Sequence, residues 1–449
     1  MTGAVCHSVR LRTILLILSV FASGAAARSQ EAARSGADSP APTVLSLREC
    51  VQLALKQNPD VLLARLDQQI AQARIGQVAD ARSLKLGVGS GLAYSSGFPM
   101  NVGGSGPSLV NAQASFTLYD RPLQYRIAEA KERAKTSGLT EREKQSAIAL
   151  DVTRLFLDAE ALSLAKDTLA LEIASLERIA GIRDSRMGEG KALPLDVKRA
   201  RASIAAARYR LREVETSLAR AQDQLGFLLG MDPGASVAPA RGERLTPETP
   251  ESLSVAKEMA LSENPQLDRL SSELAANQLR QKAASSTHWP VVRLVAQYSM
   301  FSRFNNYDDF YNRFERHNGQ IGASFELPLF TGSAARSEIT EASVESQRLR
   351  LNVQTTRGRI AMETADAFRQ AQDAEEYHQV VALDLELARE NVSVILARAN
   401  EGKASLEELE TARTEESRKW TEYYRSRASA ELAAYEILHK TGRLIALFR

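Results

Sequence analysis

Cysteine is almost absent from this chain of 449 residues, which contains only Cys6 and Cys50. Cys6 lies in the N-terminal segment discussed below, so Cys50 is a lone thiol that cannot form an internal disulfide. Cys50 falls within a helical pattern and is expected to pack as a small apolar side chain. The histidines are few and lack ligand spacing, and no Ser/His/Asp or Cys/His set can be assembled. The sequence therefore predicts no metal site, no cofactor and no enzymatic activity.

A surplus of charge of one sign is also missing. The 57 lysines and arginines nearly balance the 55 aspartates and glutamates, so the chain lacks the basic footprint of a nucleic-acid-binding protein. It has no Walker-type nucleotide-binding loop, and the glycines within residues 87–91 are not followed directly by a helix. Any work that requires energy must therefore be driven by a partner protein.

Long apolar runs are confined to the N-terminus. Two arginines precede an apolar run at 13–22, and small residues follow at 23–27. This order predicts a signal peptide over residues 1–27 and hence an exported protein. Residues 28–45 are rich in Ala, Ser, Pro and Gly and are expected to form a flexible leader. No later stretch contains 18 continuous apolar residues, so no transmembrane helix is predicted.

Two short motifs each occur twice: Glu-Gly-Lys-Ala at 189–192 and 401–404, and Ala-Leu-x-x-Asn-Pro at 54–59 and 260–265. Their spacing is far longer than the 20–50 residues of a solenoid repeat. The pattern therefore predicts a duplicated half-molecule, with a first structural repeat at 46–241 and a second at 242–449.

Each predicted repeat contains a pair of strands, at 84–96 and 109–119 and again at 291–301 and 319–330. Apolar and polar residues alternate in these segments, as in a hairpin with one apolar and one polar face. Aromatic residues near the strand ends suit a membrane–water interface: Tyr94, Phe301, Phe304 and Tyr307. A soluble two-layer sheet with one buried face would give the same alternation.

Helical patterns fill most of the rest. Ser46 followed by Glu49 has the form of a capping box. Long helical hairpins are predicted at 121–230 and 333–442, with long arms of about 100 Å, tight Glu-Gly-Lys-Ala turns and shorter returning helices. Gly230 and the corresponding Gly442 stand where helix C-caps are expected. Four amphipathic strands cannot close a barrel, so two or three copies are expected to combine their strands.

The chain resembles the TolC-like outer-membrane efflux protein family over nearly all of the sequence that follows the signal. The resemblance is carried by the two Ala-Leu-x-x-Asn-Pro motifs, the strand ends Leu118-Tyr119-Asp120 and 327–332, and the turns that lead into Asp196-Val197 and Glu408-Leu409. It implies a mainly α fold with a transmembrane β-barrel: a homotrimer with a 12-stranded barrel in the outer membrane and an α-helical barrel in the periplasm. Members are exit ducts of tripartite efflux pumps or type I secretion systems. They work with a periplasmic adaptor and an inner-membrane transporter, which usually sets the cargo.

The resemblance also implies site residues. It matches Asp196 and Glu408 to the pore constriction, although Pro194 after the first turn and Thr411 depart from the commoner pattern. It assigns the periplasmic tip turns and adaptor docking to Gly188, Glu189, Gly190, Lys191, Glu401, Gly402 and Lys403.

Physical chemistry allows two roles for the two carboxylates. Each lies in the first turn of a helix, where the helix dipole favours a negative charge. Alternatively, a ring of six carboxylates in a trimer would favour cations at the mouth. A competing function for the whole chain is a periplasmic coiled-coil adaptor or scaffold without a pore, which would explain the helices but not the duplicated hairpins.

Overall fold

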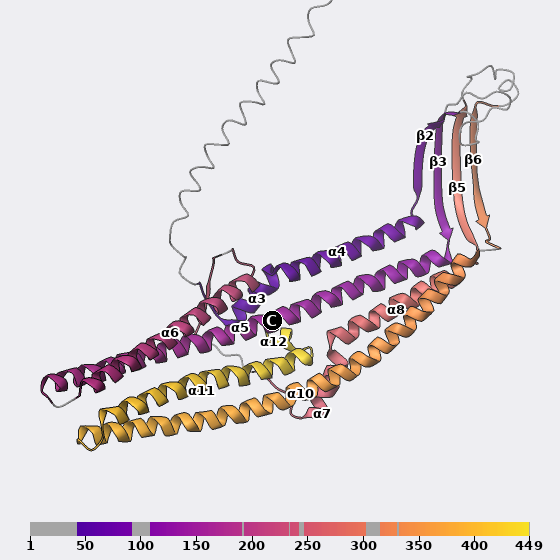
Figure 1. Cartoon of the computed structure of the whole chain (residues 1–449). Coiled ribbons are helices and arrows are strands. Elements are labelled where there is room, and N and C mark those ends of the chain that lie inside the picture. The colour runs from indigo at the N-terminus through magenta and orange to yellow at the C-terminus, as the bar shows by residue number, and fades with distance from the viewer. Residues whose placement is uncertain are drawn as a thin grey trace, which may run out of the picture.

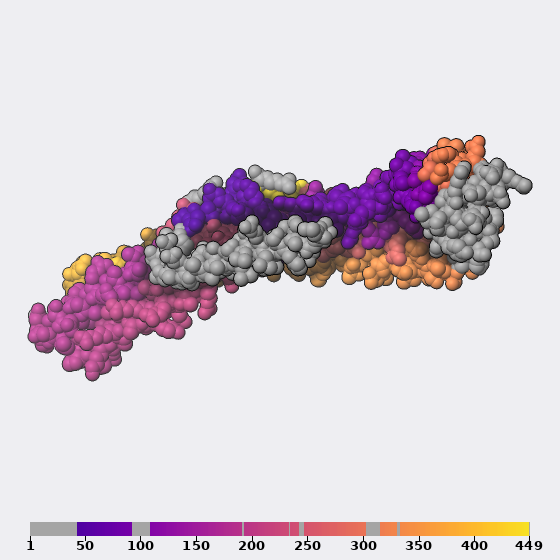
Figure 2. Space-filling model, turned by 90° about the horizontal axis from the view of Figure 1, so that it is seen from above, coloured from indigo at the N-terminus to yellow at the C-terminus, as the bar shows by residue number. Residues whose placement is uncertain are grey.

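The computed structural model describes residues 43–91, 108–190, 193–232, 234–241, 247–301, 315–329 and 332–448. The molecule is long and narrow, with a four-stranded sheet at one end and the turns of two helical hairpins at the other (Figures 1 and 2). The C-terminus lies near the middle of its length (Figure 1).

The same order of elements occurs twice. The first set is α3 (Leu47–Gln57), α4 (Pro59–Ala79), β2 (Lys85–Gly91), β3 (Ser108–Tyr119), α5 (Arg121–Gly188) and α6 (Pro194–Leu228). The second set is α7 (Leu253–Glu263), α8 (Pro265–Ser285), β5 (Val291–Phe301), β6 (His317–Glu326), α10 (Gly332–Asn400) and α11 (Leu406–Lys440). Four short elements complete the described chain: β1 (Thr43–Leu45), the 3-10 helix η1 (Asp80–Arg82), β4 (Val237–Pro239) and α12 (Leu444–Phe448).

The helices begin where side chains can bond their free N–H groups. The Ser46 hydroxyl accepts a hydrogen bond from the Glu49 N–H, and the Glu49 carboxylate accepts one from the Ser46 N–H at 2.8 Å. The expected capping box is thus confirmed, and these hydrogen bonds lower the pKa of Glu49. At the start of α5, the Asp120 carboxylate accepts a hydrogen bond from the Leu123 N–H at 2.9 Å.

The four long strands form one antiparallel sheet in the order β2-β3-β5-β6. One face carries amides in register, and the Gln320 side chain donates to that of Gln297 at 2.9 Å. Both edge strands expose apolar side chains, namely Leu86, Val88, Ile321 and Phe325. Within the described residues, neither β2 nor β6 has a neighbour on its outer side.

Two predicted boundaries are corrected. Residues 43–45 form β1, which pairs in parallel with β4, rather than the end of a flexible leader. The strand expected at 319–330 ends at Glu326. Pro328 explains the early end because it has no N–H to donate to a strand ladder. The expected strand at 84–96 is described only as far as Gly91, and residues 1–42 and 92–107 lie outside the described chain.

The main apolar core lies midway along the molecule, where the ends of the shorter helices meet α5. Cys50 is fully buried there, and burial raises the pKa of its thiol to about 12. The Phe448 ring of α12 stacks on Tyr435 of α11 at 6.1 Å between ring centroids. None of the described helices has an apolar stretch long enough to cross a membrane.

The first Asn-Pro motif forms a joint with the end of its own repeat. Asn58 caps α4 by accepting a hydrogen bond from the Asp60 N–H, and its amide donates to the Leu228 carbonyl at 2.8 Å. Gly230 follows α6 with φ +70°, and a Cβ there would lie only 2.5 Å from the Gln57 carbonyl oxygen. Gly230 is therefore required for two reasons: its backbone has a left-handed conformation, and there is no room for a side chain.

The second repeat builds the same joint. Asn264 accepts a hydrogen bond from the Gln266 N–H and donates to the Lys440 carbonyl at 3.0 Å. Gly442 follows α11 with φ +78°, and a Cβ on it would overlap the Glu263 carbonyl oxygen. The repeated motifs thus mark a place where each returning helix is held against the bend between two shorter helices.

His439 is buried between α11 and α5, where its Nδ1 lies 2.9 Å from the Ser146 hydroxyl. Burial, helped by the neighbouring Lys440, lowers the pKa of this imidazole to about 4. The folded protein therefore keeps His439 neutral in a range where an unfolded chain would bind a proton.

Acid is consequently expected to weaken the fold through His439. Because the folded pKa lies below the ordinary value near 6.5, the stabilisation is complete above that value and is lost as pH falls towards about 4. The loss amounts to about 3 kcal/mol per chain. His439→Gln should flatten the change in urea midpoint between pH 7 and pH 4.5. His317→Gln, at an exposed sheet position, is the control and should keep the slope.

Candidate functional site at the helical tips

The two Glu-Gly-Lys-Ala motifs lie at the end of the molecule far from the sheet (Figure 1). Gly190 and Gly402 have φ values of +70° and +73°, a left-handed conformation in which glycine is favoured. The Gly190 N–H donates to the Met187 carbonyl at 3.0 Å, and the Gly402 N–H donates to the Ala399 carbonyl at the same distance. These bonds end α5 and α10 and reverse the chain.

The charged residues of the turns that the structure describes, Glu189, Glu401 and Lys403, are exposed. Glu401 and Lys403 form an ion pair of 2.7 Å between their own side chains. Gly188 and Glu189 are exposed at the end of α5, while Lys191 lies outside the described residues. The tips therefore present a mixed-charge surface carried on two rigid helix ends.

Asp196 and Glu408 occupy matching positions in the first turns of α6 and α11. The Asp196 carboxylate accepts a hydrogen bond from the Leu193 N–H at 3.2 Å. Glu408 forms a complete capping box, since the Ser405 hydroxyl also accepts a hydrogen bond from the Glu408 N–H at 3.1 Å. Both carboxylates thus accept a hydrogen bond from the backbone N–H of the residue that caps their helix, in the first turn where the helix dipole also favours a negative charge.

A buried ion pair lies beside them that the sequence did not reveal. Arg183 of α5 and Glu410 of α11 approach to 2.9 Å, and both side chains are almost fully buried. The Arg183 guanidinium also donates to the Asp196 carbonyl at 3.3 Å. Arg183 therefore joins three helices and connects the two hairpins near their tips.

Comparing the two sequence repeats gives a weak indication of this ion pair. Arg183 precedes the first Glu-Gly-Lys-Ala motif at the position where Ile395 precedes the second, and Glu410 similarly corresponds to Lys198. A charged side chain whose counterpart in the matched repeat is apolar or of opposite charge indicates a contact specific to one repeat. Sequence spacing cannot say which partner it meets.

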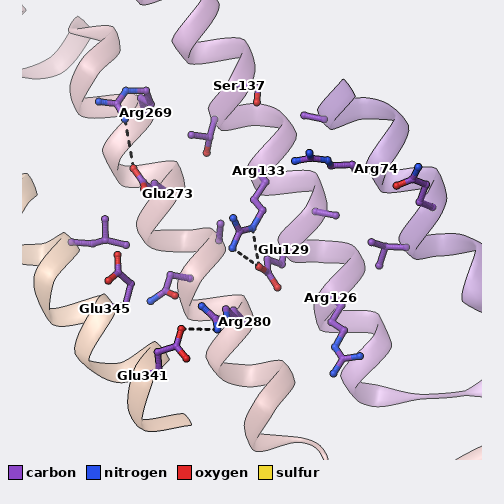
Figure 3. A pocket seen from close by; sticks show the side chains of 18 of the residues that line it. Arg74, Arg126, Glu129, Arg133, Ser137, Arg269, Glu273, Arg280, Glu341 and Glu345 are labelled. Carbon is purple, nitrogen blue, oxygen red and sulfur yellow. Dashed lines mark hydrogen bonds and ion pairs between the residues drawn. The ribbon is translucent and has the colours of Figure 1, made fainter. Parts of the chain in front are cut away.

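A groove of about 840 Å³ crosses α4, α5, α8 and α10 nearer the sheet (Figure 3). Its walls are charged, but most of the charges meet one another. Arg133 pairs with Glu129 at 2.8 Å, and Arg280 pairs with Glu341 at 2.9 Å. Such a network of mutually paired charges is typical of packed helices that remain in water.

The structure describes only one of the four expected interface aromatics. Phe301 is the last residue of β5, and its N–H donates to the Arg316 carbonyl at 2.9 Å where the hairpin ends. Tyr94, Phe304 and Tyr307 lie outside the described residues.

The duplicated architecture has a counterpart among known sequences. Residues 50–231 and 257–440 match the family model of the outer membrane efflux proteins. The chain belongs to this family. The two matched segments correspond to the two structural repeats, and family membership places the chain at the outer membrane.

Two curated relatives agree with this assignment. Protein CyaE of Bordetella pertussis is 26% identical over 316 residues, which are 68% of this chain and 64% of CyaE. Outer membrane protein TolC of Salmonella enteritidis is 24% identical over 307 residues, which are 66% of this chain and 61% of TolC. The matches therefore span less than two thirds of each relative.

Solved structures share the fold. The CmeC outer membrane channel of Campylobacter jejuni superposes with a TM-score of 0.73 at 14% identity, over 89% of this chain and 86% of CmeC. The MtrE outer membrane channel of Neisseria gonorrhoeae gives a TM-score of 0.70 at 15% identity, over 89% of both chains.

Proposed function

We propose that this protein is the exit duct of a tripartite efflux pump or type I secretion system. Three copies form a 12-stranded β-barrel in the outer membrane and a continuous helical barrel in the periplasm. A periplasmic adaptor and an inner-membrane transporter deliver cargo to the helical tips. The protein itself performs no enzymatic step and needs no cofactor.

The observation that carries this proposal is the open four-stranded sheet. It exposes apolar side chains at both edge strands, including Val88 of β2 and Ile321 of β6, and no other described strand pairs with either edge. An unpaired strand edge in contact with lipid is costly, and closure into a barrel removes it. Three copies would supply twelve strands, and the amide face would line the lumen.

The helices supply the length. The 68 residues of α5 and the 69 of α10 each extend about 100 Å from the sheet. The curated TolC relative is named as an outer membrane protein, and CmeC and MtrE are described as outer membrane channels. A duct that runs from the barrel to a distant mouth agrees with both.

The proposal is tested by locating and reconstituting the full-length protein. It should fractionate with the outer membrane and form stable single channels in a planar lipid bilayer. A soluble monomer in the periplasmic fraction would support the competing adaptor or scaffold and reject the duct.

The carboxylates of Asp196 and Glu408 form the proposed constriction ring at the tips. Because both already cap helices, Asp196→Asn with Glu408→Gln separates the two roles: an amide oxygen can still accept the N–H, but the charge is gone. The double variant should keep its thermal stability while its cation-over-anion permeability ratio falls towards unity.

Glu407→Gln is the matched control, since Glu407 is exposed in the same helical turn. An unchanged ion preference in the double variant would leave these residues with capping alone. The turn residues Gly188, Glu189, Gly190, Lys191, Glu401, Gly402 and Lys403 form the proposed adaptor-docking surface.

A further inference from the structure

The first long hairpin is covered at mid-length by an extended segment of its own chain, residues 235–241, which we call the covering segment. Strand β4 within this segment contacts both α5 and α6. The Ala235 carbonyl oxygen lies so close to α6 that a Cβ on Gly226 would be only 2.5 Å from it. Val237 of β4 is fully buried. The covering segment is therefore packed tightly onto one face of the first hairpin.

The covering segment ends with an arginine that binds α5. The Arg241 guanidinium donates to the Ser163 hydroxyl at 3.0 Å and to the Asp167 carboxylate at 2.6 Å. The residues before it have small side chains, in the order Ala-Ser-Val-Ala-Pro-Ala-Arg. The segment is thus held by small apolar side chains together with one charge-assisted contact.

The matching part of the second hairpin is an open groove of about 790 Å³ between α10 and α11. Residues of the two hairpins are matched by their distance from the Glu-Gly-Lys-Ala turns. The groove extends along α10 from Phe368 to His378 and includes Glu375, which matches Ser163. It therefore lies at the level where the covering segment binds the first hairpin.

Matched positions differ in burial because only the first hairpin is covered there by an extended segment of the described chain. Phe156 and Ala159 of α5 are 3% and 0% exposed. Their counterparts Phe368 and Ala371 of α10 are only half-buried, and both line the groove. The floor of the groove is consequently apolar and accessible.

The rim of the groove is acidic. Glu251, Glu375 and Glu376 line it and are exposed. Arg427 also lines the groove, but it pairs with Glu431 at 3.2 Å. Glu251 and Glu376 have no ion-pair partner among the residues that the structure describes. The groove therefore presents carboxylates that a cation of a ligand could neutralise.

His378 does not offset this negative charge. Burial lowers the pKa of its imidazole, and its Nδ1 lies 3.0 Å from the Ser426 hydroxyl. The ring is therefore neutral at pH 7, and the rim keeps its net negative charge.

We propose that this groove binds an extended segment of a partner protein that carries an arginine or lysine among small apolar residues. The bound segment repeats the contact that residues 235–241 make with the first hairpin. Its apolar side chains lie on Phe368 and Ala371, and its cation meets Glu375 and Glu376. The surface lies far from the tip turns proposed to bind the adaptor, so this interaction goes beyond the proposed duct.

A peptide copied from the covering segment is the probe. Fluorescently labelled Ala-Ser-Val-Ala-Pro-Ala-Arg is titrated with the full-length protein in detergent, and binding is followed by fluorescence anisotropy. We expect saturable binding that weakens as salt is added, because exposed ion pairs are screened. The Arg241→Gln form of the peptide should bind about fivefold more weakly, because it lacks the cation.

Removing charge from the rim tests whether the groove is the site. Glu375→Gln with Glu376→Gln should weaken binding by about fivefold or more, because the peptide arginine loses its carboxylates. Glu386→Gln with Glu390→Gln is the matched control, since it removes the same charge from exposed positions of α10 outside the groove. Equal losses in the two double variants would reject the groove as the binding site.

Filling the groove tests its apolar floor without changing the charge. Gln372 is exposed and lines the groove, so the indole of Gln372→Trp should cover the floor and abolish binding. Gln370→Trp is the control, because Gln370 is exposed on α10 outside the groove. Both variants should keep the circular dichroism of the unmodified protein. Unchanged binding by Gln372→Trp would overturn the proposal.

The outcomes separate this surface from the proposed duct. A protein that forms channels but does not bind the peptide rejects the partner segment and leaves the duct intact. A protein that binds the peptide but forms no channels retains the groove and rejects the duct. Binding by dissociated chains but not by the assembled oligomer would show that a second copy covers the groove, which also rejects the partner segment.

Discussion

Arg183→Met is expected to lower the free energy of unfolding by about 3–5 kcal/mol. Arg183 and Glu410 form a pair of 2.9 Å, and their side chains are only 8% and 12% exposed. Removing the guanidinium would leave the Glu410 carboxylate buried without its counter-charge. The loss should appear as a lower urea midpoint for the purified protein in detergent, followed by far-UV circular dichroism.

Two further variants isolate the cause. Arg183→Met combined with Glu410→Met should recover most of the loss, because an apolar pair leaves no buried charge. Arg154 and Glu436 connect the same two helices at 3.0 Å, but their side chains are 52% and 27% exposed, so Arg154→Met should cost less than about 1 kcal/mol. If Arg183→Met behaved like Arg154→Met, the buried pair would not hold the hairpins together.

Gly442→Ala is expected to destabilise the protein by about 2–4 kcal/mol. The left-handed backbone at φ +78° alone costs an alanine about 1–2 kcal/mol. The added Cβ would also overlap the Glu263 carbonyl oxygen, so the joint between α11 and the bend at Asn264 must shift. Gly230→Ala should have a similar effect, since its Cβ would meet the Gln57 carbonyl oxygen.

Gly234→Ala is the matched control for this pair. Its φ of +96° imposes the same kind of strain, but a Cβ there would meet nothing within 4 Å. Thermal unfolding should therefore rank Gly234→Ala as clearly milder than Gly442→Ala. Equal losses for all three alanine variants would mean that backbone conformation alone requires glycine and that the close approach contributes little.

Local rules explain how much of the fold could be predicted. The Ser46–Glu49 capping box and the terminal glycines Gly230 and Gly442 act through residues close to them in sequence. Strand alternation also acts locally, because side chains point to opposite sides of a strand in turn. The ends of the strands were predicted less well. Strand β6 ends at Glu326, before Pro328, and β1 forms because β4 lies beside it.

The candidate site could be predicted only in part, because some of its contacts join residues that are far apart in the sequence. Asp196 and Glu408 occupy the expected first helical turns, but both carboxylates are engaged in capping hydrogen bonds. The pairing of Arg183 with Glu410 could not be predicted because the two residues are distant in sequence and belong to no motif. The sequence shows that the Asn-Pro motif is repeated but not what the motif contacts. In the structure, Asn58 binds the end of α6 and Asn264 binds the end of α11.

Periodicity, caps and motifs are local properties, so the duplication, the order of helices and strands, the tip turns and the family could all be predicted from the amino-acid sequence. Which repeated residues touch became known only from the folded molecule. Packing buries a position on one flank of a repeat and leaves its counterpart exposed on the other, as with Ser272 and Leu66. The burial of a side chain depends on which elements pack against it in the folded molecule. Local sequence patterns do not specify those neighbouring elements.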